Sequence, residues 1–143
     1  MGYKHPVSVL VVISARDTGR VLMLQRRDDP TFWQSVTGSL EAGESPLATA
    51  CREVNEEIGI DVLAERLEVE DCQRQIDFEI FPHFRHRYAP DVTHNHEHWF
   101  RLQLPTGRDV MLTEHLAFRW LAPADAAALT RSWSNRQAIE EFI

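Results

Sequence analysis

The sequence predicts a single α/β or α+β domain in which strands and helices pack as a sandwich. A length of 143 residues supports one hydrophobic core and is too short for two ordinary domains. Short apolar runs typical of strands lie on both sides of one clear amphipathic helix, without strict strand–helix alternation. No internal repeat or linker rich in Pro, Gly or Ser divides the chain, so we interpret residues 1–143 as one domain.

The chain is expected to begin with a β-hairpin. Residues Val7–Ser14 form a nearly continuous apolar run of the kind found in buried strands. A turn at residues 17–19 then leads into a second strand at Val21–Gln25. An extended segment at Trp33–Thr37 follows and ends at Gly38. This order places three extended pieces ahead of the first helix.

The clearest helix is predicted over Pro46–Ile58. Ser45 can cap its first turn, Pro46 suits the first helical position, and Gly59 can end it. Four apolar residues at helical spacing are expected to form its buried stripe, namely Leu47, Cys51, Val54 and Ile58.

The second half of the chain is expected to supply the remaining strands and two more helices. The elements are, in order, a strand at Ile76–Ile80 ending at Pro82, strands at His98–Leu104 and Ala117–Leu121, and a short helix at Pro123–Leu129. A capping box formed by Ser134 and Gln137 is expected to begin the last helix.

Composition restricts the partners. The net charge of -7 argues against a nucleic-acid backbone, because such binders neutralise phosphates with clustered Lys and Arg. An acidic protein can still bind a small phosphorylated molecule if metal ions bring positive charge. The apolar run Val7–Ile13 is far shorter than the roughly 20 residues that span a bilayer, so no membrane partner is expected. Two cysteines in no metal or disulfide pattern, with no secretory segment, indicate a reducing cytoplasm.

Three glutamates of the predicted helix point to metal chemistry. Glu53, Glu56 and Glu57 stand at i, i+3 and i+4, so they share a narrow arc of the helix where like charges repel. A hard divalent cation such as Mg²⁺, with Mn²⁺ as the alternative, would relieve that repulsion because it prefers oxygen ligands. Arg52 could orient one carboxylate through a bidentate pair. The competing interpretation is that these glutamates are only the solvated face of an amphipathic helix.

The wider pattern decides between these interpretations. From Gly38 to Ile60 the chain reads Gly, five residues, Glu, seven residues and then Arg-Glu-Val-Asn-Glu-Glu-Ile-Gly-Ile, which resembles the Nudix signature at all nine specified positions. The resemblance implies an α/β/α sandwich with a mixed sheet and a loop-helix-loop catalytic motif. It also implies Mg²⁺-dependent hydrolysis of a phosphoanhydride. The motif positions that carry it include Gly38, Glu44, Arg52 and Gly59.

The same resemblance assigns roles to individual residues. It implies that Glu53, Glu56 and Glu57 are metal ligands, with Glu44 a weaker candidate. A fourth ligand, Glu114, is implied by similarity outside the motif, although a solvated turn residue would look the same. A glutamate free of metal would act as general base. The sequence leaves open whether this is Glu56, Glu57 or Glu114.

Segments outside the motif indicate which class of substrate the enzyme acts on. They resemble the Nudix subfamily that releases pyrophosphate from a pterin triphosphate in folate synthesis, at Arg20–Arg27, Phe32–Gly38, Glu114–Trp120 and Ser132–Gln137. The candidate substrate-binding residues are Lys4, Arg26, Thr37, Phe78, Glu79, Ile80, Phe81 and Ser132. Several have a plainer interpretation: the lysine as a solvated terminus, the arginine as an ordinary surface charge, and the apolar residues as core.

Two alternatives to a pterin substrate remain open at this point. The chain could be a Nudix nucleoside triphosphate pyrophosphatase, or a Nudix-fold module that binds a nucleotide without cutting it. The second is disfavoured because all four motif glutamates are present. Alternating His94, His96 and His98 could bind zinc but lack a completing ligand, so we expect no zinc site. A monomer or small homo-oligomer is expected.

Overall fold

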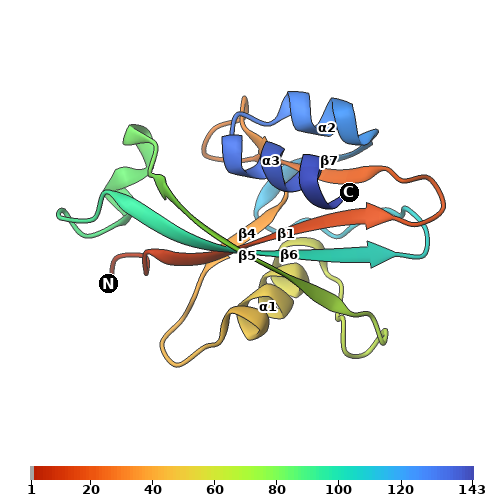
Figure 1. The fold of residues 1–143 in the computed structure, drawn as a ribbon, viewed down its shortest axis with the longest axis horizontal. Coiled ribbons are helices and arrows are strands. Elements are labelled where there is room, and N and C mark those ends of the chain that lie inside the picture. Colours follow the sequence, from red (N-terminus) through yellow and green to blue (C-terminus); the bar gives the residue numbers. More distant parts are fainter. Residues whose placement is uncertain (1) are drawn as a thin grey trace.

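The computed structural model describes residues 2–143. One mixed sheet forms the middle layer, with α1 (Pro46–Ile58) on one face and α2 (Pro123–Leu129) and α3 (Trp133–Phe142) on the other (Figure 1). This three-layer arrangement confirms the α/β/α sandwich. Among residues 2–143 no helix is long and apolar enough to cross a membrane.

The sheet contains seven strands. They are β1 (Val7–Ala15), β2 (Val21–Arg26), β3 (Trp33–Gln34), β4 (Val36–Ser39), β5 (Val69–Glu79), β6 (His94–Leu104) and β7 (His115–Leu121). A short 3₁₀ helix, η1 (Pro82–Arg87), connects β5 to β6. The order is β3-β2-β1-β6-β5, with β4 also paired to β1 and β7 to β2. Among the strand pairs of residues 2–143, only β1–β6 is parallel, which makes the sheet mixed.

Strand β1 lies at the centre and is buried on both faces, which explains its continuous apolar sequence. Val9, Val11 and Ile13 face α1 and contribute to one core cluster. Leu10 and Val12 face α2 and α3 and contribute to a second cluster. The expected hairpin is confirmed, because β1 and β2 pair antiparallel.

Helix α1 begins and ends where the sequence predicted. The Ser45 hydroxyl accepts a hydrogen bond from the Ala48 amide at 3.1 Å, and Gly59 adopts a left-handed φ of 72°. The predicted buried stripe is partly wrong, because Leu47 is 49% exposed whereas Glu57 is only 3% exposed. The buried side of the helix is therefore rotated away from the predicted apolar stripe and toward the side that carries the glutamates. The helix therefore turns part of its acidic face inward.

Other element boundaries also differ from expectation: β7 begins at His115 rather than Ala117, and the segment expected at Trp33–Thr37 forms two strands, β3 and β4. Strand β5 begins at Val69 rather than Ile76, and β6 begins at His94 rather than His98. Their added residues are largely polar, so pairing between the strands, rather than apolar alternation, defines them. Helix α3 is capped by Ser132, whose hydroxyl accepts from the Asn135 amide at 3.2 Å. The capping box predicted at Ser134 is wrong.

Candidate active site

Strand β4 approaches α1 so closely that Gly38 has no room for a side chain. A Cβ atom at this position would lie 1.8 Å from Oε2 of Glu53. Any larger residue would displace that carboxylate. The motif glycine therefore sets the distance between the strand and the acidic face of the helix.

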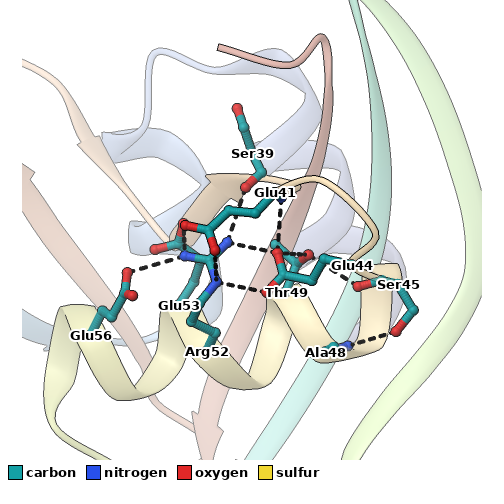
Figure 2. A network of polar contacts seen from close by, with 9 residues as sticks. All are labelled: Ser39, Glu41, Glu44, Ser45, Ala48, Thr49, Arg52, Glu53 and Glu56. Atoms are coloured by element: carbon teal, nitrogen blue, oxygen red, sulfur yellow. Dashed lines mark hydrogen bonds and ion pairs between the residues drawn. The ribbon is translucent and has the colours of Figure 1, made fainter. Parts of the chain in front are cut away.

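Arg52 is the centre of a polar network that joins the motif loop to α1 (Figure 2). Its Nε and Nη2 atoms each donate to the Glu44 carboxylate at 2.8 Å, and Nη2 also donates to the Ser39 carbonyl at 3.1 Å. The bidentate pair lowers the pKa of Glu44 to about 2, chiefly through the Arg52 hydrogen bonds. Glu44 thus acts as a fixed anion that anchors the loop through Arg52.

The remaining arginine donor holds two of the predicted metal ligands. Nη1 of Arg52 donates to Oε2 of Glu53 at 3.3 Å and to Oε2 of Glu56 at 3.2 Å. The Glu53 side chain is 13% exposed, whereas that of Glu56 is 49% exposed. One guanidinium therefore orients carboxylates from both the loop and the helix.

Glu53 and Glu57 are the buried members of the acidic group. Burial raises the pKa of Glu53 to about 7, although the neighbouring charge of Arg52 opposes the rise. The pKa of Glu57 is raised well above its usual range, first by burial and then by the charges of Glu53 and Glu114. Oε1 of Glu57 is buried without a hydrogen-bond partner among the described residues. Nε2 of His115 lies 3.8 Å from this atom, but burial lowers the pKa of His115 to about 4, so the imidazole is neutral near pH 7 and supplies no compensating charge.

This arrangement fits a hard divalent cation. Within residues 2–143, no three His, Cys, Asp or Glu side chains are gathered closely enough to enclose a cation as they stand. The donors are nevertheless carboxylate oxygens, the ligands that Mg²⁺ prefers, and one of them is orphaned in a buried position. Burial first, and repulsion between the carboxylates second, raise the pKa values of Glu53 and Glu57, and a bound cation would offset both effects. The assignment of Glu53, Glu56, Glu57 and Glu114 as ligands stays a prediction.

Two cavities meet beside this acidic group. The acidic cavity, of about 300 Å³, is lined by Glu57, Glu114, His115, Arg27, Asp28 and five further residues. The aromatic cavity, of about 100 Å³, lies toward α3 and is lined by Phe32, Phe78, Ile80, Phe81, Phe84, Tyr88 and a set of polar residues. Both are lined by Lys4, Arg26, Gln34, Thr37 and Arg87. A single elongated ligand can therefore occupy both.

Positive charge is concentrated where the two cavities join. Lys4 donates its backbone N–H to the Arg87 carbonyl at 2.8 Å, which fixes the N-terminal segment beside η1. Desolvation, and then the charges of Arg87 and Arg26, lower the pKa of Lys4. Arg26 pairs with Asp28 at 2.7 Å and stacks 4.2 Å from the Phe84 ring centroid. The junction thus presents several cationic groups to an anionic ligand.

Seven of the eight residues predicted to bind substrate line a cavity. Those at the junction are Lys4, Arg26 and Thr37, and those of the aromatic cavity are Phe78, Ile80, Phe81 and Ser132. Glu79 is exposed and is not among the lining residues of either cavity in the described chain. It follows Phe78 on β5, and strand alternation directs consecutive side chains to opposite faces. Its predicted role is therefore not supported by its position.

Sequence reasoning missed the polar floor of the aromatic cavity. Asn95 and Glu97 of β6 are both buried and line this cavity. The alternating histidines lie on the opposite face of the same strand, where His96 contacts Asp77 and Gln75 at 2.8 Å each. Asn95 and Glu97 alternate with these histidines along the strand. This alternation was the available indication that the two polar residues point to the other face of the sheet, into the interior.

The fold and motif define a Nudix hydrolase, and a family model described as NUDIX domain matches residues 4–142. The chain belongs to this family. It is 66% identical over 141 residues to the dihydroneopterin triphosphate diphosphatase of Escherichia coli strain K12, covering 99% of this chain and 94% of that protein. It is 49% identical to the Haemophilus influenzae protein of the same name, covering 100% and 90% respectively.

Solved structures agree with the assignment of the chain to the Nudix family. The structure of the E. coli dihydroneopterin triphosphate pyrophosphohydrolase superposes with a TM-score of 0.98 at 65% identity, covering 100% of this chain and 98% of that one. A Caenorhabditis elegans Ap4A hydrolase superposes with a TM-score of 0.73 at 22% identity, covering 95% and 93%. At 22% identity, the similarity to the C. elegans enzyme is evidence for a shared fold and not for a shared substrate.

Proposed function

We propose that this enzyme hydrolyses dihydroneopterin triphosphate to dihydroneopterin monophosphate and pyrophosphate, a reaction of folate synthesis. The observation that carries the proposal is the pair of joined cavities. The aromatic cavity suits a flat bicyclic ring, and the acidic cavity suits a phosphate chain with its metal. The names of the two bacterial relatives support the same substrate.

The residues of the junction bind and orient the phosphate chain. Arg26 and Arg87 offer guanidinium donors, and Lys4 offers an ammonium, at the point where the chain would pass between the cavities. The Thr37 hydroxyl donates to the Val9 carbonyl at 2.9 Å, so it contributes a fixed oxygen rather than a free donor. These groups place the phosphoanhydride next to the carboxylates of Glu57 and Glu114.

Mg²⁺ is the cation that we assign to this site, with its ligands drawn from Glu53, Glu56, Glu57 and Glu114, and the general base is one of these that stays free of the metal. A bound Mg²⁺ would supply positive charge to the phosphate chain and would make a water molecule more acidic. A carboxylate takes the proton of the attacking water as the new oxygen–phosphorus bond forms and the bridging bond breaks, releasing pyrophosphate. Of the candidates for this base, Glu57 and Glu114 line the acidic cavity, which favours them over Glu56.

The direct test is pyrophosphate release by the full chain with Mg²⁺. Dihydroneopterin triphosphate is compared with a panel of nucleoside triphosphates and nucleotide sugars, each with and without excess chelator. A kcat/KM for the pterin at least tenfold above every nucleotide, abolished by chelator, is the expected result. A nucleotide preference would reject the pterin and leave a nucleoside triphosphate pyrophosphatase. Absence of turnover on the whole panel would favour a binding module.

A further inference from the structure

Strand β6 places two polar side chains at the floor of the aromatic cavity. Asn95 and Glu97 are two residues apart, so they point to the same face of the sheet, toward α3. Their exposed fractions are 3% and 4%. Ser8 of the neighbouring strand β1 lies opposite Glu97 in the parallel register and lines the same cavity. Polar groups this deeply buried need hydrogen-bond partners.

The Asn95 amide is held in one orientation with its acceptor free. Its Nδ2 donates to the Ser8 hydroxyl at 2.6 Å. The other end of the amide, Oδ1, is buried and has no hydrogen-bond partner within the described part of the chain. Leaving a buried acceptor unpaired is unfavourable, so its position at the cavity indicates a partner that arrives from outside the protein.

Glu97 adds a second acceptor beside the first. One carboxylate oxygen accepts from Nε1 of Trp99 at 3.0 Å, and the Ser134 hydroxyl also hydrogen-bonds to this carboxylate. Among residues 2–143 no Lys, Arg or His donates to it. The floor of the cavity therefore presents carboxylate and amide oxygens that neutral donors satisfy only in part.

The geometry points to Asn95 and Glu97 as specificity-determining residues that accept hydrogen bonds from adjacent N–H groups of a heterocycle. In a pterin these donors are the 2-amino group and the neighbouring ring N–H of the 2-amino-4-oxopyrimidine ring. A carboxylate matches two parallel N–H donors, and the amide oxygen of Asn95 can accept the second amino hydrogen. The assignment rests on the proposed function, and it extends that function to the atoms that distinguish a pterin from its analogues.

The first test uses the wild-type enzyme and two inhibitors. Dihydroneopterin is compared with its 2-oxo analogue, in which an oxygen acceptor replaces the 2-amino donor. Because two acceptors would then face each other, the 2-oxo compound should inhibit at least about tenfold more weakly. Equal inhibition by the two compounds would overturn the assignment without the need for any variant.

The second test uses Glu97→Gln, with Glu140→Gln on the exposed surface of α3 as the matched control. The glutamine keeps a carbonyl oxygen for Trp99 but replaces one acceptor with an N–H donor. We expect the KM for dihydroneopterin triphosphate to rise about 10- to 100-fold. We also expect the preference for dihydroneopterin over the 2-oxo compound to fall below about threefold, because the new donor can pair with the 2-oxo group.

A structural role alone would change activity without changing this preference. A folded Glu97→Gln enzyme that retains the wild-type preference would therefore refute the inference, as would a KM equal to that of the Glu140→Gln control. Failure of the proposed function has a different signature. In that case the wild-type enzyme itself would turn over a nucleotide better than the pterin triphosphate.

Discussion

Replacing Glu97 by glutamine should stabilise the protein at neutral and alkaline pH. The side chain is 4% exposed, and burial raises the pKa of its carboxyl from 4.5 to about 7. In the unfolded chain the same carboxyl ionises near its ordinary value. Folding at pH 8 therefore carries the cost of placing this charge in the interior, and a neutral glutamine of the same shape removes that cost.

The magnitude follows from the size of the pKa difference. Below pH 4.5 both states bind the proton, and Glu97 makes no pH-dependent contribution. Between pH 4.5 and about 7 the unfolded state loses its proton first, so stability falls as the pH rises. At about 1.4 kcal/mol per pKa unit, the total loss is about 3 kcal/mol and is complete above pH 7. The Glu97→Gln variant should be free of this loss.

Urea unfolding followed by tryptophan fluorescence measures the effect, because Trp99 is buried beside the substitution. The free energy of unfolding of Glu97→Gln minus that of the wild type should be near zero at pH 4.5 and about 3 kcal/mol at pH 8. The Glu140→Gln control should change it by less than about 0.5 kcal/mol at both values. A difference that is independent of pH would show that Glu97 is ionised at the same pH in both states, and it would refute the reasoning.

Three further substitutions test the site. Gly38→Ala should lower kcat by at least about 100-fold in steady-state assays, because its Cβ would occupy the space of the Glu53 carboxylate; full activity would refute the close approach. Glu53→Gln and Glu57→Gln should each lower turnover by orders of magnitude at limiting Mg²⁺ while the circular dichroism spectrum is retained; near-normal rates in both would remove them as ligands. Asn135→Ala should lower the free energy of unfolding by about 2 kcal/mol in urea titrations, because its side chain makes two buried hydrogen bonds to Ser35, and an unchanged midpoint would contradict this.

Elements with strong local determinants were predicted from sequence with accurate boundaries. Helix α1 has a serine cap, a proline in its first turn and a glycine terminator, and its observed range of Pro46–Ile58 equals the expected one. The range Pro123–Leu129 of α2 was also correct. The spacing of the motif glutamates along α1 likewise follows from local sequence, because one helix carries three of them.

Features that depend on tertiary packing were not predictable in the same way. The apolar periodicity of α1 placed Leu47 in the core, but the helix rotates to direct Glu57 against β4 and the acidic cavity. No single-helix pattern contains that information, because it depends on the strand that the helix meets. Asn95 and Glu97 were missed for a similar reason. Their burial depends on residues of α3 and η1, distant in the sequence, that line the same cavity.

Glu53 and Glu57 lie on one side of the sheet and Glu97 lies on the other. We therefore expect substitutions at the two places to affect different kinetic constants. Glu53 and Glu57 belong to α1, where the proposed function locates the phosphoanhydride, so groups there would act on charge that changes during the reaction. Glu97 faces α3, where a non-reacting ring would be held equally in the ground state and the transition state. Loss of ring contacts should therefore raise KM and leave kcat nearly unchanged, whereas displacement of Glu53 by Gly38→Ala should lower kcat. An Asn95 or Glu97 variant that lowered kcat as strongly as Gly38→Ala would show that the ring contacts also align the phosphates.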